Sequence, residues 1–359
     1  MKIRMLTVCA AAALLFAAGL AAAQAPAGAQ AGPPAGAPGG RAGGPPSLDF
    51  FKTDDPRSNP FTRAQIEGWK TTIPSGSGPY GAVRGEPDTL PTNTIFYPKD
   101  LAKVKGKMPI LSFANGACSG QPLELTEVYT ELASHGFLVA TIGRIGGTVN
   151  GGDLSLQIKF IDWAIAENDR KGSPFYNKLD TKKIGLSGQS CGGVMAIRNA
   201  GDPRVSTVLI LNSGIFIAGA PGVPRGGAPG TPPAGAPPAG APGGGGRRGG
   251  GPSPMDVGKE ALKAFHTPVA YLLGGPKDIA YANGVDDVEK IEGVPVFMAS
   301  TNVGHLATYG TPSGGEFGKL AVDWFNYQLK GDKNAAKTFV GPDCKLCTNP
   351  LWEVKRKNM

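Results

Sequence analysis

Nearly continuous apolar runs alternate with amphipathic stretches through most of this 359-residue chain. Residues 108–113, 137–142 and 205–211 are almost entirely apolar, which is typical of strands covered on both faces of a parallel sheet. Residues 154–168 instead carry apolar side chains at helical spacing. Because parallel strands need crossover connections of this length, the pattern predicts an α/β fold with a mostly parallel central sheet and helices on both faces.

The same reasoning assigns the remaining elements. We expect strands at 94–97, 108–113, 137–142, 183–186, 205–211, 269–273 and, as the last strand, 294–299. We expect helices at 123–134, 154–168, 191–199 and 318–329, with further helices near Glu260 and after Asp278. Since ligands bind beyond the carboxyl ends of the strands in such sheets, functional residues are sought in the loops that follow strands.

The N-terminus has the layout of a secretory signal peptide. Lys2 and Arg4 precede an apolar stretch over residues 5–20, and Ala21-Ala22-Ala23 supplies small residues for cleavage. A membrane anchor is the alternative, but the alanine-rich composition favours cleavage near Ala23. We therefore predict a signal peptide over residues 1–23 and a secreted or periplasmic protein without stable membrane insertion.

Two stretches consist largely of Ala, Gly and Pro, namely residues 24–46 and residues 218–254. Such segments bury too little apolar surface to offset the entropy lost on ordering. We expect a flexible linker over 24–46, and one α/β domain over 47–359 that contains a disordered insertion at 218–254.

The formal net charge is +8, and the basic residues are scattered apart from Arg247-Arg248 and residues 355–357. A nucleic-acid interface needs basic residues gathered on one face with aromatic residues among them. The charge pattern therefore indicates no nucleic-acid partner. The sequence does not predict an oligomeric state.

One motif carries a specific chemistry. Gly188-Gln189-Ser190-Cys191-Gly192-Gly193 lies between the expected strand 183–186 and the expected helix 191–199. This is Gly-x-Ser-x-Gly in a strand–turn–helix context, where side chains at the glycines would clash with the strand and the helix. The turn presents the Ser190 hydroxyl at the positive end of a helix, so Ser190 is the predicted nucleophile. Ser187 is a poorer candidate because Gln189, not glycine, stands two positions after it.

A serine hydroxyl needs a base, and the chain has three histidines. His135 and His266 each precede an expected strand, at the amino end of the sheet, and suit helix C-termini. His305 follows the strand 294–299, on the same edge as Ser190. His305 is therefore the predicted general base.

Asp278 is the first carboxylate after the strand 269–273, and it would hold the imidazole in one tautomer. Asp286 and Asp287 are alternatives, although their place in the following helix suggests a solvated face. The order Ser190, Asp278, His305 along the chain is the order of this motif's usual triad.

An oxyanion hole completes the expected site. The backbone N–H of Cys191, the residue after the nucleophile, is one predicted donor. Ala117, in the loop after the strand 108–113, is the predicted second donor.

The four cysteines of the mature chain suggest disulfides in an oxidising compartment. We hypothesise that Cys118 and Cys191 form a bond that fixes the oxyanion hole, the alternative being two small buried thiols. Cys344 and Cys347 lie in the tail after the last expected helix, so a local structural disulfide is favoured over a redox motif.

Three segments together resemble secreted α/β-hydrolases: 188–193, Gly274-Gly275-Pro276-Lys277-Asp278-Ile279-Ala280-Tyr281 and Val303-Gly304-His305. The nearest groups are bacterial polyester hydrolases and cutinases, dienelactone hydrolases and chlorophyllase-like proteins. The resemblance extends from about Ala82 to the C-terminus. It implies the α/β-hydrolase fold and the hydrolysis of carboxylic esters.

We therefore expect a secreted serine carboxylic ester hydrolase that works through an acyl-enzyme on a small-molecule or polymeric ester. This chemistry needs no metal or organic cofactor. An acyltransferase or exopeptidase with the same triad is one alternative. A non-enzymatic exported binding protein that reuses the fold is another.

Overall fold

The computed structural model describes residues 48–217 and 253–359. These residues belong to one compact unit, Gly44–Met359. The predicted signal peptide over 1–23, the linker over 24–46 and residues 218–252 of the predicted insertion lie outside the described residues.

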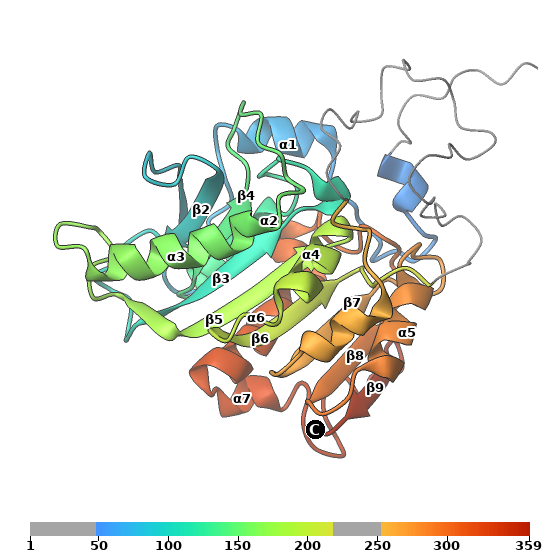
Figure 1. Cartoon of the computed structure of the whole chain (residues 1–359). Helices are drawn as coiled ribbons and strands as arrows, with labels where there is room; N and C mark the ends of the chain where they lie inside the picture. Colours follow the sequence, from blue (N-terminus) through green and yellow to red (C-terminus); the bar gives the residue numbers. More distant parts are fainter. Residues whose placement is uncertain (1–47, 218–252) are drawn as a thin grey trace, which may run out of the picture. The chain divides into compact units, whose positions relative to one another are not determined.

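A single mixed sheet organises the described part of the chain, where nine strands run in the order β1-β2-β4-β3-β5-β6-β7-β8-β9 (Figure 1). Neighbouring strands are parallel from β4 through β3, β5, β6 and β7 to β8, whereas β1, β2 and β9 pair antiparallel at the two edges. The strands are β1 (Ala82–Gly85), β2 (Asn93–Pro98), β3 (Met108–Ala114), β4 (Leu138–Ile142), β5 (Leu179–Gln189), β6 (Val205–Leu211), β7 (Val269–Leu273), β8 (Val296–Ser300) and β9 (Glu353–Lys357). The predicted α/β fold with a mostly parallel sheet is confirmed.

Helices cover both faces of this sheet. The α-helices are α1 (Arg63–Trp69), α2 (Thr126–Ser134), α3 (Ser155–Asp169), α4 (Cys191–Asn199), α5 (Tyr281–Lys290), α6 (Gly315–Lys330) and α7 (Lys333–Ala336). Short 3-10 helices are η1 (Leu48–Phe51), η2 (Gly116–Cys118), η3 (Lys259–Ala264) and η4 (Pro312–Gly314). Helices α2 and α6 pack on one face, and α3, α4 and α5 pack on the other (Figure 1).

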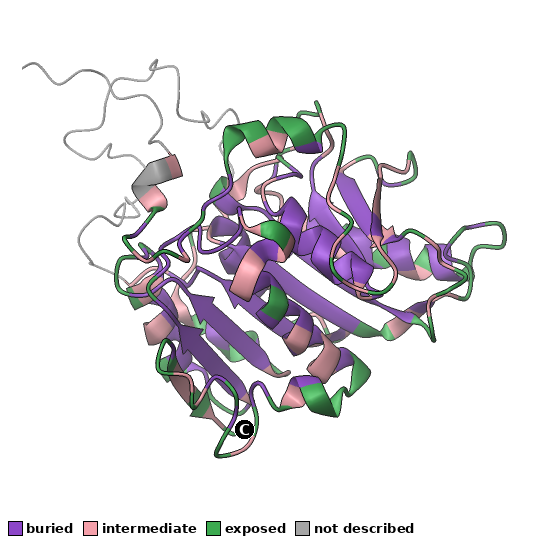
Figure 2. Ribbon diagram, turned by 180° about the vertical axis from the view of Figure 1, so that it is seen from behind, coloured by how far each residue is buried: buried purple, intermediate pink, exposed green. Residues whose placement is uncertain are grey.

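Strand β6 shows why the central strands are apolar throughout. Leu209 and Leu211 belong to the core beneath α2 and α6, whereas Val208 and Ile210 belong to the core beneath α3, α4 and α5. Because successive side chains of a strand point to opposite faces, a sheet with two covered faces needs apolar residues at every position. Figure 2 shows the central strands buried along most of their length.

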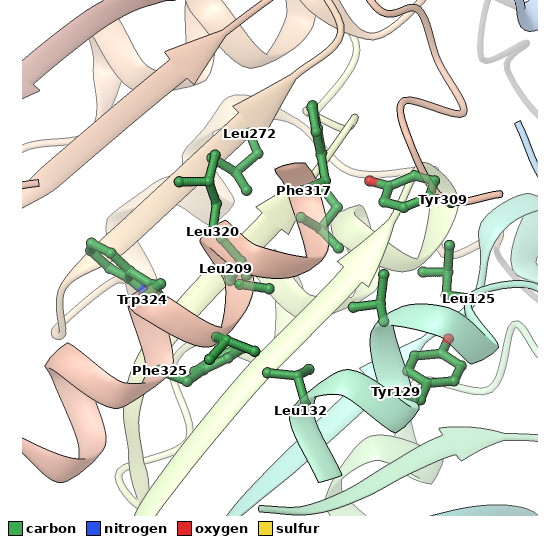
Figure 3. Close-up of a cluster of buried hydrophobic side chains, with 14 of the residues drawn as sticks. Leu125, Tyr129, Leu132, Leu209, Leu272, Tyr309, Phe317, Leu320, Trp324 and Phe325 are labelled. Carbon is green, nitrogen blue, oxygen red and sulfur yellow. The ribbon is translucent and has the colours of Figure 1, made fainter. Parts of the chain in front are cut away.

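The core on the α2 and α6 face is rich in aromatic side chains (Figure 3). Phe325 of α6 is fully buried and lies against Phe113 and Phe137, with ring centroids 6.4 and 6.3 Å away. A Cβ added at Gly185 of β5 would lie 2.6 Å from the Phe325 ring. The helix therefore approaches the sheet closely because β5 has no side chain at that point.

The sequence-based assignment is wrong at the edges of the sheet. Strand 294–299 is not the last strand, because β9 pairs antiparallel with β8, and β1 adds the opposite edge. The sequence of β9 is Glu-Val-Lys-Arg-Lys, which lacks an apolar run because edge strands are partly solvated. Strand β5 begins at Leu179 rather than 183, α2 begins at Thr126 rather than 123, and the segment near Glu260 is the 3-10 helix η3.

Within residues 48–217 and 253–359, none of the helices combines the length and apolar character that crossing a bilayer requires.

We predict that Phe325→Ala lowers the free energy of unfolding by about 3–5 kcal/mol, because it removes a buried ring and leaves a cavity between α6 and β5. Urea unfolding followed by circular dichroism measures this change. Lys319→Ala, at an exposed position of the same helix, is the control and should stay within about 0.5 kcal/mol of the parent. Equal losses in the two variants would contradict the packing described.

Candidate active site

Three predicted residues meet beyond the carboxyl ends of the strands. Ser190 follows β5, Asp278 follows β7 and His305 follows β8. The Ser190 Oγ lies 2.9 Å from His305 Nε2, and His305 Nδ1 lies 2.6 Å from Asp278 Oδ1. His305 and Asp278 are 5% and 3% exposed, so the pair is shielded from water. The structure thus joins hydroxyl, imidazole and carboxylate in one hydrogen-bonded chain.

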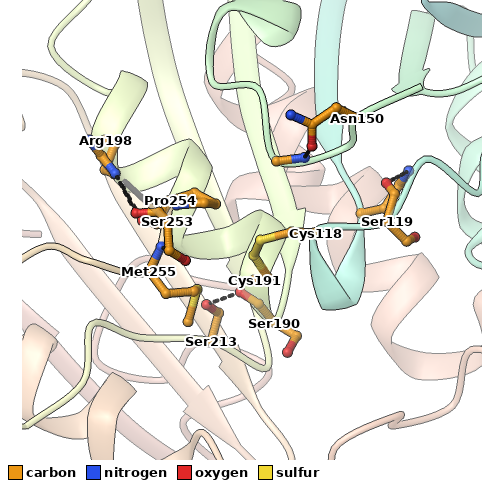
Figure 4. Close-up of a disulfide and its surroundings, with 12 residues drawn as sticks. Cys118, Ser119, Asn150, Ser190, Cys191, Arg198, Ser213, Ser253, Pro254 and Met255 are labelled. Carbon is orange, nitrogen blue, oxygen red and sulfur yellow. Dashed lines mark hydrogen bonds between the residues drawn. A yellow bond between two sulfur atoms is a disulfide. The ribbon is translucent and has the colours of Figure 1, made fainter. Parts of the chain in front are cut away.

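The turn that carries Ser190 has an unusual backbone. Ser190 has φ 54° and ψ −120°, a conformation that L-residues rarely adopt. A Cβ at Gly188 would lie 2.1 Å from the Gly192 carbonyl oxygen, and a Cβ at Gly192 would lie 2.0 Å from that of Ala114. The glycines are therefore required because the turn, the helix α4 and the end of β3 approach one another closely. The Ser213 hydroxyl donates to the Ser190 carbonyl oxygen across this turn (Figure 4).

Asp278 is held as an ionised acceptor. Its carboxylate accepts hydrogen bonds from Asn212 Nδ2 at 2.8 Å and from the backbone N–H groups of Gly274 and Ala280 at 3.0 and 2.9 Å. Burial raises the pKa of Asp278, but the hydrogen bond from His305 and the other donors outweigh it and hold this pKa below its ordinary value. An ionised Asp278 keeps the proton on His305 Nδ1, which leaves Nε2 as an acceptor toward Ser190.

Sequence reasoning missed Asn212, the residue directly after β6. Its backbone has φ 43°, and its side chain is fully buried. Besides Asp278, the Asn212 amide donates to the Gly304 carbonyl oxygen at 3.1 Å and accepts from the Tyr309 hydroxyl at 2.6 Å. A polar residue immediately after the predicted strand 205–211 was the available signal, because that is where site residues lie in such sheets.

The loops that carry Asp278 and His305 are in direct backbone contact. The N–H of Gly304 donates to the Gly274 carbonyl oxygen at 2.8 Å. A Cβ at Gly274 would lie 1.9 Å from the Gly304 carbonyl oxygen, so only glycine fits there. Gln189, which precedes Ser190, donates from Nε2 to the His305 carbonyl oxygen at 3.1 Å. These contacts fix the distance between the His305 imidazole and the Asp278 carboxylate.

The loop after β3, which carries Ala117, is anchored by Asn115. The Asn115 amide donates to the carbonyl oxygens of Ile142 and Ser119 at 2.6 and 3.0 Å. Ala117 itself is exposed and has φ 51°.

The other predicted oxyanion donor lies at the start of a helix. Cys191 is the first residue of α4, where backbone N–H groups have no partner within the helix.

The hypothesised disulfide between Cys118 and Cys191 is present, with the two Cα atoms 5.2 Å apart (Figure 4). It joins the residue after Ala117 to the residue after Ser190. The bond therefore ties the two segments on which the predicted oxyanion donors lie. Cys344 and Cys347 form the second disulfide, in the loop before β9.

The alternative carboxylates do not contact His305 in the way Asp278 does, but the expected solvated face is wrong for Asp287. Its side chain is fully buried and binds Lys259 Nζ at 2.6 Å, the Tyr271 hydroxyl at 3.2 Å and the Ile215 N–H at 2.9 Å. Asp287 instead links α5 to the segments that carry Ile215 and Lys259. The charge of a residue in an amphipathic helix does not by itself predict whether its side chain is buried.

The other two histidines lie apart from this group. His135 is the C-cap of α2, and its Nε2 lies 3.1 Å from Glu131 Oε1. His266 is exposed and precedes β7. Among the described side chains, no group of three or more His, Cys, Asp and Glu residues is arranged to hold a metal ion.

A family of known proteins matches the part of the chain that carries Ser190. Residues 73–211 match a family model described as PETase: PET hydrolase-like. This match supports the resemblance to the polyester hydrolase group, and it identifies the fold as that of the α/β-hydrolases. The matched stretch includes Ala117, Ser190 and Cys191 and ends before Asp278 and His305. A search of curated proteins found no match.

Glu124 brings a further titratable group to the loop that carries Ala117. Its Oε1 lies 3.4 Å from the Ser119 hydroxyl, and burial raises its pKa to about 7. Between its ordinary pKa and 7, the folded protein keeps a proton that the unfolded chain has lost. The free energy of unfolding therefore falls as pH rises through this window.

We predict that Glu124→Gln reduces this dependence between pH 5 and pH 8, because the amide does not titrate; Asp287, whose pKa is raised by burial to about 6, keeps its own contribution. Urea unfolding at the two pH values measures the slope. Glu292→Gln, at an exposed position, is the control and should keep the parent's slope. A Glu124→Gln protein with the parent's slope would contradict the raised pKa.

We also predict that removing the Cys118–Cys191 bond in Cys118→Ala/Cys191→Ala lowers the free energy of unfolding by about 4 kcal/mol, because the bond closes a long loop in the unfolded chain. Cys344→Ala/Cys347→Ala, whose cysteines are 3 residues apart, is the comparison and should lose about 2 kcal/mol. Peptide mapping without reductant checks the pairing. Free thiols at 118 and 191 in the parent would refute it.

Proposed function

We propose that this protein is a serine hydrolase that cleaves carboxylic esters through an acyl-enzyme intermediate. The observation that carries the proposal is the chain of two hydrogen bonds, 2.9 Å from Ser190 to His305 and 2.6 Å from His305 to Asp278. The match of residues 73–211 to a PET hydrolase-like family supports ester hydrolysis independently, because it rests on the part of the chain without Asp278 and His305.

In the first step Ser190 Oγ attacks the ester carbonyl carbon while His305 Nε2 takes the hydroxyl proton. The imidazolium that forms is stabilised by the buried Asp278 carboxylate, which already accepts hydrogen bonds from three other donors. Because those donors are fixed by the loops, the carboxylate needs little rearrangement during the reaction.

The carbonyl oxygen becomes an oxyanion as the tetrahedral intermediate forms. We assign its stabilisation to the backbone N–H groups of Cys191 and Ala117. Cys191 opens α4, so the positive end of that helix acts on the same charge. The disulfide between Cys118 and Cys191 would keep the two donors at a constant separation.

Collapse of the intermediate breaks the ester C–O bond, and the alcohol leaves with the proton from His305 Nε2. Water then attacks the acyl group on Ser190, with His305 again taking and returning a proton, and the carboxylic acid is released. These steps use the chain's own residues and need no metal or organic cofactor.

We further propose that the protein is exported, to the periplasm or beyond, after cleavage near Ala23. The signal-like sequence of residues 1–23 supports this location, and two disulfides suit an oxidising compartment. The substrate is a small-molecule or polymeric ester, as the PET hydrolase-like match suggests.

We predict that a fluorophosphonate probe labels the protein at Ser190, and that Ser190→Ala abolishes labelling and lowers kcat for 4-nitrophenyl acetate by about 10⁴-fold or more. Asp278→Asn should lower kcat by about 10⁴-fold as well, because the amide favours the wrong imidazole tautomer. Mass spectrometry of the labelled peptide and initial rates measure these outcomes.

Ser187→Ala is the matched control, because Ser187 lies in β5 only three residues before Ser190 and its hydroxyl donates to the Leu209 carbonyl oxygen instead. This variant should keep labelling and turnover. A parent protein that neither reacts with the probe nor hydrolyses esters would identify a binding protein. If an added alcohol or amine captured the acyl group in preference to water, the activity would be acyl transfer.

A further inference from the structure

Residues 51–59, which we call the N-terminal strap, run along the loop that carries His305. The buried hydroxyl groups of Thr53 and Ser58 donate to two successive carbonyl oxygens of that loop, those of residues 302 and 303, each at 2.8 Å. In Figure 1 the blue segment after η1 reaches the orange loops that follow β7 and β8. The strap is therefore hydrogen-bonded to the base's own loop.

Three more hydrogen bonds extend this contact at either end. Arg57 Nη2 donates to the Thr301 hydroxyl at 2.7 Å. The backbone of Asn59 donates to the Ala307 carbonyl oxygen at 3.0 Å and accepts from the Gly310 N–H at 2.7 Å. The strap thus holds the loop on both sides of His305.

The strap also explains the glycine before His305. Gly304 has φ +80°, and a Cβ there would lie 2.4 Å from the Phe51 carbonyl oxygen and 3.0 Å from Thr53. The strap backbone passes so close that a side chain at position 304 would displace it. The strap and the loop that carries His305 are therefore closely packed, and their contact requires glycine at position 304.

Phe51 places an aromatic ring against the imidazole. The Phe51 and His305 ring centroids are 5.4 Å apart with the planes tilted by 42°. Phe51 is only partly buried, so part of its surface stays accessible. The mechanism proposed above assigns no role to Phe51.

We propose that Phe51 is a specificity-determining residue that contacts the alcohol portion of the ester and favours alcohols that carry an aromatic group. The inference rests on the proposed ester hydrolysis. His305 Nε2 must reach the leaving alcohol oxygen to protonate it, so the group attached to that oxygen lies beside the imidazole and hence beside Phe51. The carbonyl oxygen points elsewhere, toward the N–H groups of Cys191 and Ala117.

Three acetate and ethyl esters separate the two sides of the substrate: benzyl acetate has its ring on the alcohol, ethyl phenylacetate has it on the acyl group, and ethyl acetate has none. We expect Phe51→Ala to lower kcat/KM for benzyl acetate about tenfold, mainly through KM, because an aromatic contact is lost. Rates for the other two esters should stay within about twofold. Phe51→Tyr should restore the preference, and a pH-stat assay on the mature chain measures all rates.

Tyr176→Ala removes an exposed aromatic residue in the loop before β5 and is the control for surface change. If all three esters lose the same factor, or if ethyl phenylacetate alone is affected, Phe51 does not contact the alcohol and the inference is wrong. Fluorophosphonate labelling at Ser190 is measured in each variant. Normal labelling with unchanged ester preference overturns only the role of Phe51, whereas absent labelling and turnover in the parent overturns the proposed hydrolysis as well.

Discussion

The site depends on the backbone contact between the loop after β7 and the loop after β8. Gly274 and Gly304 meet without side chains between them, and Asn212 binds both the Asp278 carboxylate and the Gly304 carbonyl oxygen. Three strands of one rigid sheet thereby set the position of the imidazole relative to Ser190. Such preorganisation matters because a shift of about 1 Å in reacting groups can cost about 10²-fold in rate.

Local sequence patterns were enough to predict the central sheet and three residues of the candidate site. The apolar runs of β3, β6 and β7 show burial on both faces, and Gly-x-Ser-x-Gly requires one particular turn. Contacts between distant segments were not predictable in the same way. Asn212 resembles any loop asparagine until the Asp278 and His305 loops are placed beside it, and Phe51 lies more than 250 residues before the imidazole it touches. The edge strand β9 was missed because its charged residues carry no apolar signal.

Asp287 shows the same difficulty in a helix. Two adjacent aspartates in α5 suggest a solvated face of the helix. Asp287 is nevertheless fully buried, whereas Asp286 lies near the surface beside Lys259 and Lys290. Buried carboxylates are tolerated only where donors surround them, and here those donors come from β7 and from the segments before residue 218 and after residue 252. Their convergence is a property of the tertiary fold.

The hydrogen bonds of Asp287 bear on how much the length of the chain can vary between β6 and β7. Ile215 precedes residues 218–252 and Lys259 follows them, and both are bonded to the same carboxylate on α5. Ile215 and Lys259, which flank that segment, are therefore both held by the same side chain of α5. The number of residues between Ile215 and Lys259 can therefore change without breaking either bond or altering the pairing of β6 with β7.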